Sequence, residues 1–152
     1  MNNMDREKII QMMDWHQNID IQSYAVRKAM EDSNIEYWIQ PRYYKYSWEN
    51  CAKVIASKDD LSLLGYLPKI LEWLQDMNWP GALIILERLK KFNPILLKND
   101  LEKTILIANQ RTEIEWLEAL SEFWDIQEIR NILENPAKTI LEDICKLTII
   151  IT

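Results

Sequence analysis

The residue best suited to acid–base chemistry is His16, the only histidine in the 152-residue chain. Asp14 and Asp20 lie close to it in the sequence, and a histidine beside a carboxylate is a common general-base pair. Catalysis would also need a nucleophile or a substrate pocket, and the sequence indicates neither. Asp14 and Asp20 are equally suited to helix ends, which favours a surface histidine at a helix corner. An enzyme, or an enzyme-associated subunit with a groove near His16, is therefore an alternative and not the leading hypothesis.

The other reactive side chains lack the spacing that catalysis or metal binding requires. Acidic pairs such as Glu113/Glu115 are one or two residues apart, so on a helix they point to different faces. Cys51 and Cys145, with a single histidine, do not have zinc-ligand spacing, which favours reduced, packed thiols. The chain has two glycines, too few for a phosphate loop or a nucleophile elbow. We therefore expect no catalytic residues, no metal and no cofactor.

The loop after Pro41 is the first candidate binding surface. It contains Arg42, Tyr43, Tyr44, Lys45 and Tyr46. Three tyrosines in four residues cannot all be buried in a polar loop, and tyrosine with arginine is typical of protein-recognition surfaces. A loop folded back on the neighbouring helices is an equal alternative. Base stacking on nucleic acid needs a more basic surface than two cationic side chains provide.

The second candidate surface is acidic. Residues 112–134 contain seven acidic side chains and one basic side chain, and this difference of −6 equals the net charge of the chain. Steps of three and four place four of the acids on one face of a predicted helix and its corner: Glu115, Glu118, Glu122 and Asp125. The opposite, apolar face is made of Trp116, Leu117, Leu120 and Phe123. The charge disfavours nucleic acid and permits a basic protein partner; a solvated face that only maintains solubility is the alternative.

Periodicity and the scarcity of glycine predict that these surfaces stand on a nearly all-helical chain. No apolar run approaches the ~18 residues of a membrane span, and the polar N-terminus does not resemble a signal peptide, so we expect a cytoplasmic protein that binds no membrane. Residues 148–152 are β-branched. A strand-like tail packed on the last helix is one alternative for them, and an exposed chain end without such structure is the other.

The predicted helical segments are 5–17, 20–32, 34–39, 48–57, 60–76 with a bend near Gly65 and Pro68, 79–92, 98–110, 113–123, 126–134 and 137–147. Asp76 is a turn former at the end of 60–76, and Asn93-Pro94 should end 79–92. The expected caps at helix starts are Ser47, Asp59, Thr112 and Asp125.

A weak internal repeat arranges these segments. Ile21, Trp48 and Trp79 are each followed, three and four positions later, by an adjacent pair with a small residue: Tyr24-Ala25, Cys51-Ala52 and Ala82-Leu83. The three large residues are 27 (48 − 21) and 31 (79 − 48) positions apart. Such a period is typical of stacked helical hairpins, although ordinary amphipathic helices can produce it. We predict an all-α fold, an α-α superhelix of stacked antiparallel helix pairs, as a single domain over residues 1–152.

The chain contains seven tryptophans, and we expect most of them in the core. Those at predicted corners, Trp15, Trp79 and Trp124, should pack between successive helix pairs, with each indole N–H donating to a backbone carbonyl. An interface role competes, because tryptophan and tyrosine dominate binding hot spots.

Three stretches resemble a known family. They are Trp48-Glu49-Asn50-Cys51-Ala52, Tyr66-Leu67-Pro68, and the string LEWLQDMNWPGA from Leu71 to Ala82. Together with Glu115-Trp116-Leu117 they resemble an uncharacterised bacterial family, the domain of unknown function 5071, over about residues 48–134. The resemblance implies a HEAT-like α-α fold in a bacterial protein and supplies no catalytic residues. Small helical proteins of this appearance are often found in toxin–immunity neighbourhoods.

The leading hypothesis is a non-enzymatic module that binds another protein, a basic one if the acidic face is used. An immunity (antitoxin-like) or regulatory role in bacteria would fit it. A structural or oligomerising domain is a further alternative, and the oligomeric state stays open.

Overall fold

All the regular structure of this protein is helical in the part that the computed structural model describes, which is the backbone of residues 1–151 and the side chains of residues 1–147. No strand occurs in that part. The α-helices are α1 (Asn3–Met12), α2 (Ile19–Met30), α3 (Trp48–Ala56), α4 (Asp60–Leu63), α5 (Leu67–Glu72), α6 (Ala82–Lys90), α7 (Pro94–Gln110), α8 (Ile114–Ser121), α9 (Gln127–Ile132) and α10 (Ala137–Ile151). The 3₁₀ helices are η1 (Glu36–Trp38), η2 (Lys45–Ser47), η3 (Leu64–Tyr66), η4 (Trp73–Gln75) and η5 (Glu122–Asp125).

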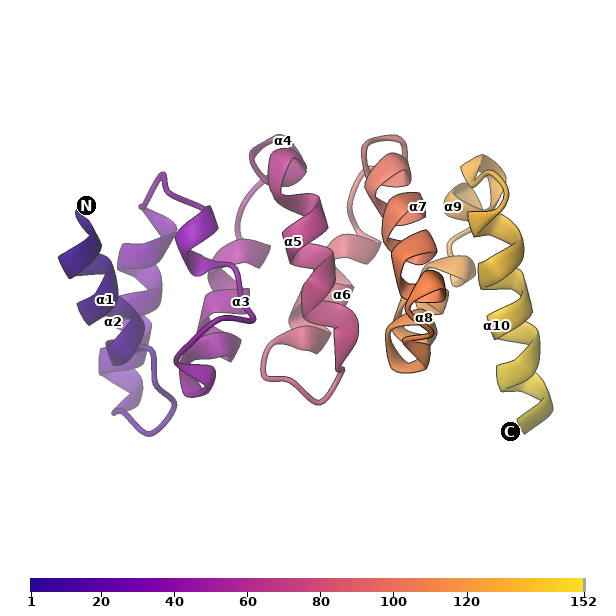
Figure 1. Ribbon diagram of the computed structural model, residues 1–152. Helices are drawn as coiled ribbons and strands as arrows, with labels where there is room; N and C mark the ends of the chain where they lie inside the picture. The colour runs from indigo at the N-terminus through magenta and orange to yellow at the C-terminus, as the bar shows by residue number, and fades with distance from the viewer. Residues whose placement is uncertain (152) are drawn as a thin grey trace.

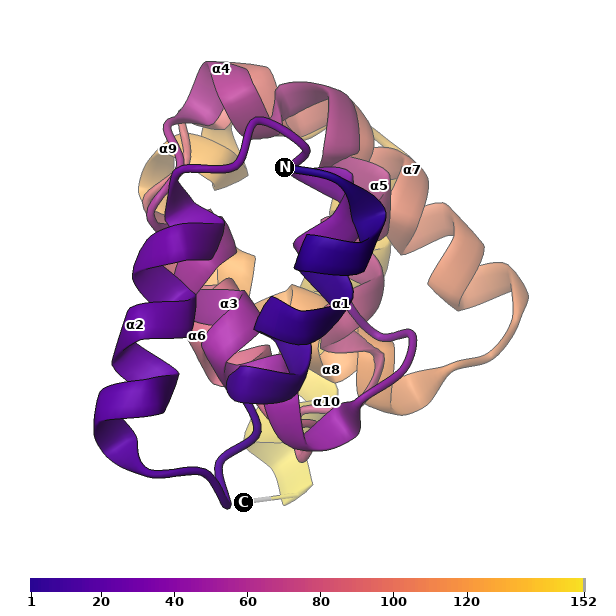
Figure 2. The same cartoon turned by 90° about the vertical axis from the view of Figure 1, so that its left-hand side faces the viewer.

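The helices follow one another in a row from the N-terminal α1 to the C-terminal α10, which lie at opposite ends (Figure 1). Viewed along the row, α2, α3 and α6 lie on one side and α1, α5 and α7 on the other (Figure 2). Helix α2 packs on α3 and α3 on α6, while α7 packs on α5, α8 and α10. Each helix therefore contacts mainly its neighbours in the row. No helix in the described part is both long and apolar enough to cross a membrane.

The helix starts depend on local capping, which also explains the differences from the predicted bounds. We predicted that Asn93-Pro94 would end one helix and that the next would begin at 98. Instead Asn93 caps α7: its side-chain oxygen accepts from the backbone N–H of Ile95 at 2.9 Å and of Leu96 at 3.2 Å, and Pro94 occupies the first turn, where a missing N–H costs nothing. Asp59 caps α4 as predicted, accepting from the Ser62 N–H at 2.8 Å.

Other predicted caps are wrong. Thr112 and Asp125 do not cap α8 and α9. The N-cap positions are occupied by Glu113 and Ile126, and neither side chain forms a capping hydrogen bond. Ser47 precedes α3, but its hydroxyl donates to the Ile10 carbonyl at 2.5 Å instead of capping the helix. The hydroxyl therefore ties α3 to α1. The strand-like tail that the sequence left open does not form over residues 148–151, because α10 continues to Ile151; Thr152 lies outside the described residues.

The small residues of the predicted repeat lie where neighbouring helices meet. Ala25, Ala52 and Ala82 are fully buried on α2, α3 and α6, which pack in that order. A methyl side chain at these positions lets two helix backbones approach closely. The large first residues of the repeat are less regular, since Ile21 is exposed and Trp79 precedes α6.

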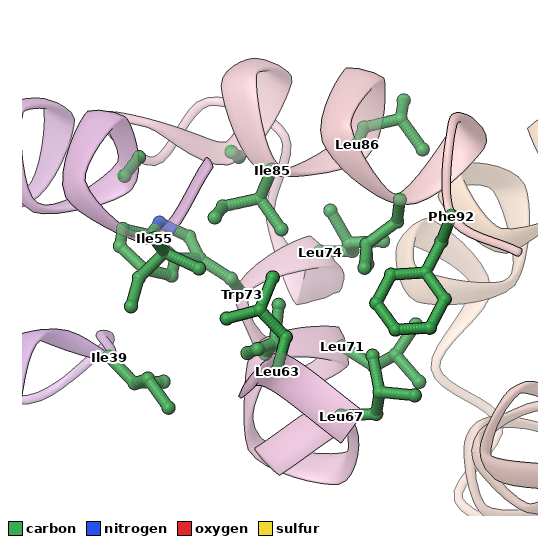
Figure 3. Packing of buried hydrophobic residues seen from close by; sticks show 14 of the residues in the cluster. Ile39, Ile55, Leu63, Leu67, Leu71, Trp73, Leu74, Ile85, Leu86 and Phe92 are labelled. Carbon is green, nitrogen blue, oxygen red and sulfur yellow. The ribbon is translucent and has the colours of Figure 1, made fainter. Parts of the chain in front are cut away.

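A continuous apolar core runs through the row of helices. In its middle Ile55 of α3, Trp73 of η4 and Ile85 of α6 point toward one another, with Leu63 of α4 below them (Figure 3). The chain at Gly65 forms η3 and breaks the segment before α5, close to the predicted bend. This break lets α4 and α5 both place leucines in the core.

The expectation that most tryptophans are buried is confirmed, but not for the corner residues. Trp38, Trp48, Trp73 and Trp116 are buried, and their indole N–H groups donate to an Asp32 carboxylate oxygen and to the carbonyls of Tyr43, Pro80 and Leu71. At the corners, by contrast, Trp15 is 44% exposed, and Trp79 and Trp124 are half-buried. A corner leaves one side of a large ring without a neighbouring helix, so the ring stays partly in water.

Three side-chain hydrogen bonds join residues that are about 30 positions apart in the sequence. The Lys58 ammonium donates to the Met30 carbonyl at 2.6 Å, and the Arg88 guanidinium donates to the Lys58 carbonyl at 2.7 Å. The Lys90 ammonium likewise donates to Glu122 at 2.6 Å. These separations, 28, 30 and 32 residues, match the period of the sequence repeat. Side-chain hydrogen bonds therefore recur along the row at a spacing close to that of the sequence repeat.

Among the described side chains, Asp32 is the most buried carboxylate, and it joins α1 to η1. Its oxygens accept from Arg6 Nε at 2.7 Å, from the Trp38 indole at 3.1 Å and from the Asn34 N–H at 3.2 Å. Burial by itself raises the pKa of Asp32, but the hydrogen bonds from Arg6, Asn34 and Trp38 outweigh it and hold the pKa below its ordinary value. A carboxylate with a lowered folded-state pKa stabilises the fold above its unfolded pKa, and this contribution is lost as the pH falls through the folded value.

Replacing Asp32 by asparagine should lower the free energy of unfolding by about 2–4 kcal/mol near neutral pH, because Arg6 loses its anionic partner. The difference from the wild type should shrink as the pH falls from neutral through the lowered folded-state pKa of Asp32, because the wild-type carboxylate then also loses its charge. Urea denaturation of both proteins across this range measures it. Asp143→Asn, at an exposed position of α10, is the matched control and should change little. A difference that is the same at every pH would contradict the role given to the Asp32 charge.

Candidate functional site

A groove between α6 and α8 gathers most of the predicted acidic residues. It has a volume of about 460 Å³. Carboxylates of Glu115, Glu118 and Glu122 line it from α8 and η5, and Asp76 joins them from the corner before α6. The apolar part of the lining consists of Met77, Leu83, Leu86 and Ala119. We call this site the acidic groove; it combines an anionic rim with apolar contact surface.

The four acids of the groove are not equivalent. The Glu122 carboxylate lies 2.6 Å from the Lys90 ammonium, and this hydrogen bond raises the pKa of Lys90. Asp76 accepts from the Asn78 N–H at 2.8 Å, which shapes the corner. Within residues 1–147, Glu115 and Glu118 form no ion pair. Their charges are therefore the ones that a partner could neutralise.

Three of the four acids predicted on one face, Glu115, Glu118 and Glu122, line the same groove; their role in binding stays a prediction. Asp125 lies outside the lining of the groove, because the α-helix ends at Ser121 and η5 turns the chain with a different period. The apolar residues predicted on the opposite side, including Trp116 and Phe123, are buried. The three- and four-residue spacing places side chains on one face only within the α-helix, which ends at Ser121.

Leu83 and Asp76 belong to the groove but were not among the predicted site residues. Leu83 is 62% exposed at the start of α6, although the sequence shows it inside an apolar run. Asp76 was interpreted only as a turn former. Each lies more than 30 residues from α8 in the sequence, so no local pattern could place them beside Glu118.

The loop of residues 42–46, which we call the tyrosine loop, does not form one patch, because its side chains point to three places. Arg42 turns toward Glu36, with 3.5 Å between Nη2 and Oε1, and Lys69 binds the same carboxylate. Tyr46 packs against the rings of Trp15 and His16, at centroid distances of 5.3 and 4.9 Å. Tyr43 and Tyr44 remain together. The loop is thus partly folded back, as the alternative interpretation had it, yet its tyrosines stay exposed.

Tyr43 and Tyr44 line a second surface pocket of about 480 Å³ with Glu7 of α1 and Tyr37 of η1. We call it the tyrosine pocket. The Tyr44 hydroxyl donates to Glu7 Oε1 at 3.0 Å, which joins the loop to α1. Burial raises the pKa of Tyr37, and the nearby Glu7 charge raises it further, so the phenol stays neutral. Neither Glu7 nor Tyr37 was predicted as a site residue.

His16 lies at the corner between α1 and α2 and lines neither the acidic groove nor the tyrosine pocket. Its side chain is 66% exposed. Asp14 Oδ1 lies 2.8 Å from His16 Nδ1 and also accepts from the His16 backbone N–H at 2.8 Å. The backbone hydrogen bond is the largest cause of the lowered pKa of Asp14. This geometry is that of a polar turn.

The two cysteines are free thiols in different surroundings. Cys51 is fully buried, and burial raises the pKa of its thiol to about 12, so it is not a thiolate nucleophile at neutral pH. Cys145 is partly buried, which raises its pKa as well. Among the described residues, no group of three or more histidine, cysteine or acidic side chains is arranged to hold a metal ion.

Comparison with known proteins assigns the chain to a family. Searches of curated proteins and of solved structures find no match. The sequence profile of one family, described as a domain of unknown function (DUF5071), matches residues 49–149, beyond the end at 134 that the resemblance suggested. The matched range contains α3 almost entirely, all of α4 to α9 and most of α10, and with them the whole acidic groove. The chain therefore belongs to the DUF5071 family.

Proposed function

We propose that this protein is a non-enzymatic, cytoplasmic binding module whose acidic groove holds a basic segment of another protein. The groove is the observation that carries this proposal, because it offers free carboxylates around apolar side chains. Lysine and arginine side chains would pair with Glu115 and Glu118, and an apolar side chain between them would cover the exposed part of Leu83. Charge at the rim speeds association, and apolar contact at the centre supplies affinity.

The scaffold for this groove is, in our proposal, a HEAT-like α-α superhelix. Three features support it: helices that contact mainly their neighbours in the row, a buried alanine on each of α2, α3 and α6, and hydrogen bonds that recur at about 30-residue separations. Stacked helix pairs of this kind typically bind extended partners along one face.

Reversing the charge of Glu118 should test the groove. Selection of peptides from a random display library on the wild-type protein should enrich sequences with lysine or arginine on both sides of an apolar residue. Binding of one such peptide to Glu118→Lys should be on the order of tenfold slower at low salt. For the wild type, the association rate should fall as ionic strength rises, since screening shortens the range of the charges. Stopped-flow fluorescence with a labelled peptide measures both effects.

Asp143→Lys is the matched control, because Asp143 is exposed on α10 and lies outside the groove while the net charge changes equally. It should bind the peptide at nearly the wild-type rate. Glu122 is a poorer choice for substitution, since a lysine there would face Lys90 and disturb the fold. Selected peptides without basic residues, or equal slowing by Glu118→Lys and Asp143→Lys, would contradict the proposal.

An immunity or regulatory role in a bacterium is the biological setting that we propose for such a module. A toxin gene beside this gene would support the immunity role, and a toxin with a basic surface segment would be the expected partner. An enzymatic role near His16 is less well supported, because the ring is largely exposed and its carboxylate neighbour is engaged in a turn.

A further inference from the structure

The tyrosine pocket combines three aromatic rings with one carboxylate. The rings of Tyr43 and Tyr44 meet edge to face at a centroid distance of 5.9 Å, and Tyr37, across the pocket, is supported by an edge contact with Trp38 at 5.0 Å. The faces of such rings carry partial negative charge and attract cations. At about 480 Å³, the pocket falls within the size range of small-ligand sites, roughly 300–1,000 Å³.

The charge of Glu7 is available in this pocket. Among the described residues, Glu7 hydrogen bonds to the neutral Tyr44 hydroxyl and forms no ion pair with a lysine or arginine. Of the cations next to pocket residues in the sequence, Arg6 is held by Asp32 at 2.7 Å and Arg42 by Glu36 at 3.5 Å. In the described part of the chain, Lys8 and Lys45 form no ion pair with Glu7. Within that part, Glu7 therefore brings a negative charge that no ion pair neutralises, while the guanidinium near the Tyr37 ring, that of Arg6, is already paired with Asp32.

The backbone holds the tyrosines in place before any ligand arrives. The carbonyl of Tyr43 accepts from the indole N–H of the buried Trp48 at 2.9 Å. Tyr44 has a left-handed backbone conformation with φ of 58°, which is uncommon for a residue with a side chain. The fold also contains a cation contact on one of these rings, because the Arg6 guanidinium lies 6.0 Å from the centre of the Tyr37 ring.

From these contacts we infer that the tyrosine pocket binds an alkylammonium group. The group belongs either to a free quaternary amine or to a lysine-derived side chain of a protein; both present a cation surrounded by alkyl groups. The rings contact the alkyl groups and the Glu7 carboxylate balances the charge. This site is separate from the acidic groove and does not depend on the function proposed for it.

Titration of the full-length protein with choline, followed by calorimetry and by the NMR signals of the tyrosine rings, tests the inference. We expect saturable binding with a dissociation constant on the order of millimolar, and binding of the uncharged isostere 3,3-dimethylbutan-1-ol at least about fivefold weaker. Glu7→Gln, which keeps the hydrogen-bond acceptor, and Tyr43→Leu, which keeps an apolar side chain, should each weaken choline binding about fivefold or more.

Tyr46→Leu is the control, because it removes a ring from the same loop but outside the pocket, and it should bind choline like the wild type. Equal melting temperatures would show that the pocket variants are folded. A trimethyl-lysine peptide separates the two sources: tighter binding than choline indicates a protein side chain, and binding no tighter indicates a free amine. Equal binding of the uncharged isostere, no binding of either cation, or choline binding unchanged by both Glu7→Gln and Tyr43→Leu would overturn the inference.

Discussion

Replacing Trp73 by alanine should lower the free energy of unfolding by about 3–5 kcal/mol, which is the usual cost of removing a large buried side chain. Trp73 is fully buried at the centre of the core, between α3, α4 and α6 (Figure 3). Its indole N–H donates to the Pro80 carbonyl at 3.0 Å. The substitution would leave both a cavity and an unpaired carbonyl beneath the corner before α6. Urea denaturation followed by far-UV circular dichroism measures the change.

Two further variants separate the contributions of Trp73. Trp73→Phe fills most of the cavity but cannot donate to Pro80, so it should cost only about 1–3 kcal/mol. Trp79→Ala removes a tryptophan that is half-buried and meets the Trp48 ring edge to face at 5.7 Å, and it should destabilise less than Trp73→Ala. If Trp79→Ala destabilised the protein more than Trp73→Ala, the assignment of the central core residue would be wrong.

Replacing Gly81 by alanine should destabilise the protein by about 2–5 kcal/mol, for two reasons that add. The backbone of Gly81 is left-handed, with φ of 85°, a conformation that side chains disfavour. A Cβ atom there would also lie 2.6 Å from the Ala52 Cβ and 2.9 Å from the Trp48 carbonyl oxygen. Because both neighbours belong to α3, the clash would push α6 away from α3. Thermal and urea denaturation measure the loss.

Gly65, the other glycine of the chain, provides the matched control. A Cβ at Gly65 would meet no atom within 4 Å, and its backbone is not left-handed. Gly65→Ala should therefore leave stability unchanged or raise it by up to about 1 kcal/mol, since alanine reduces the freedom of the unfolded chain. Similar effects of the two substitutions would show that the approach of α6 to α3 does not require Gly81.

Much of the fold was predictable because it depends on local interactions. The scarcity of glycine and the three- and four-residue spacing of leucines predicted an all-helical chain, and the break near Gly65 was visible in the same way. The apolar side of α8, with Trp116 and Leu120, was predicted correctly, because the period of a helix determines which side chains share a face. Family membership was likewise visible in the string from Leu71 to Ala82.

The candidate sites were only half predictable, because each joins residues from helices that are distant in the sequence. Periodicity placed Glu115 and Glu118 on one face, but only the packing of α8 beside α6 brought Leu83 and Asp76 to them. In the same way, Glu7 reaches Tyr44 across 37 residues. The composition of the 42–46 loop could not show that Arg42, Tyr44 and Tyr46 point to different neighbours. Sequence spacing determines the faces of each helix, whereas the tertiary packing decides which faces meet, and a pocket exists only where they do.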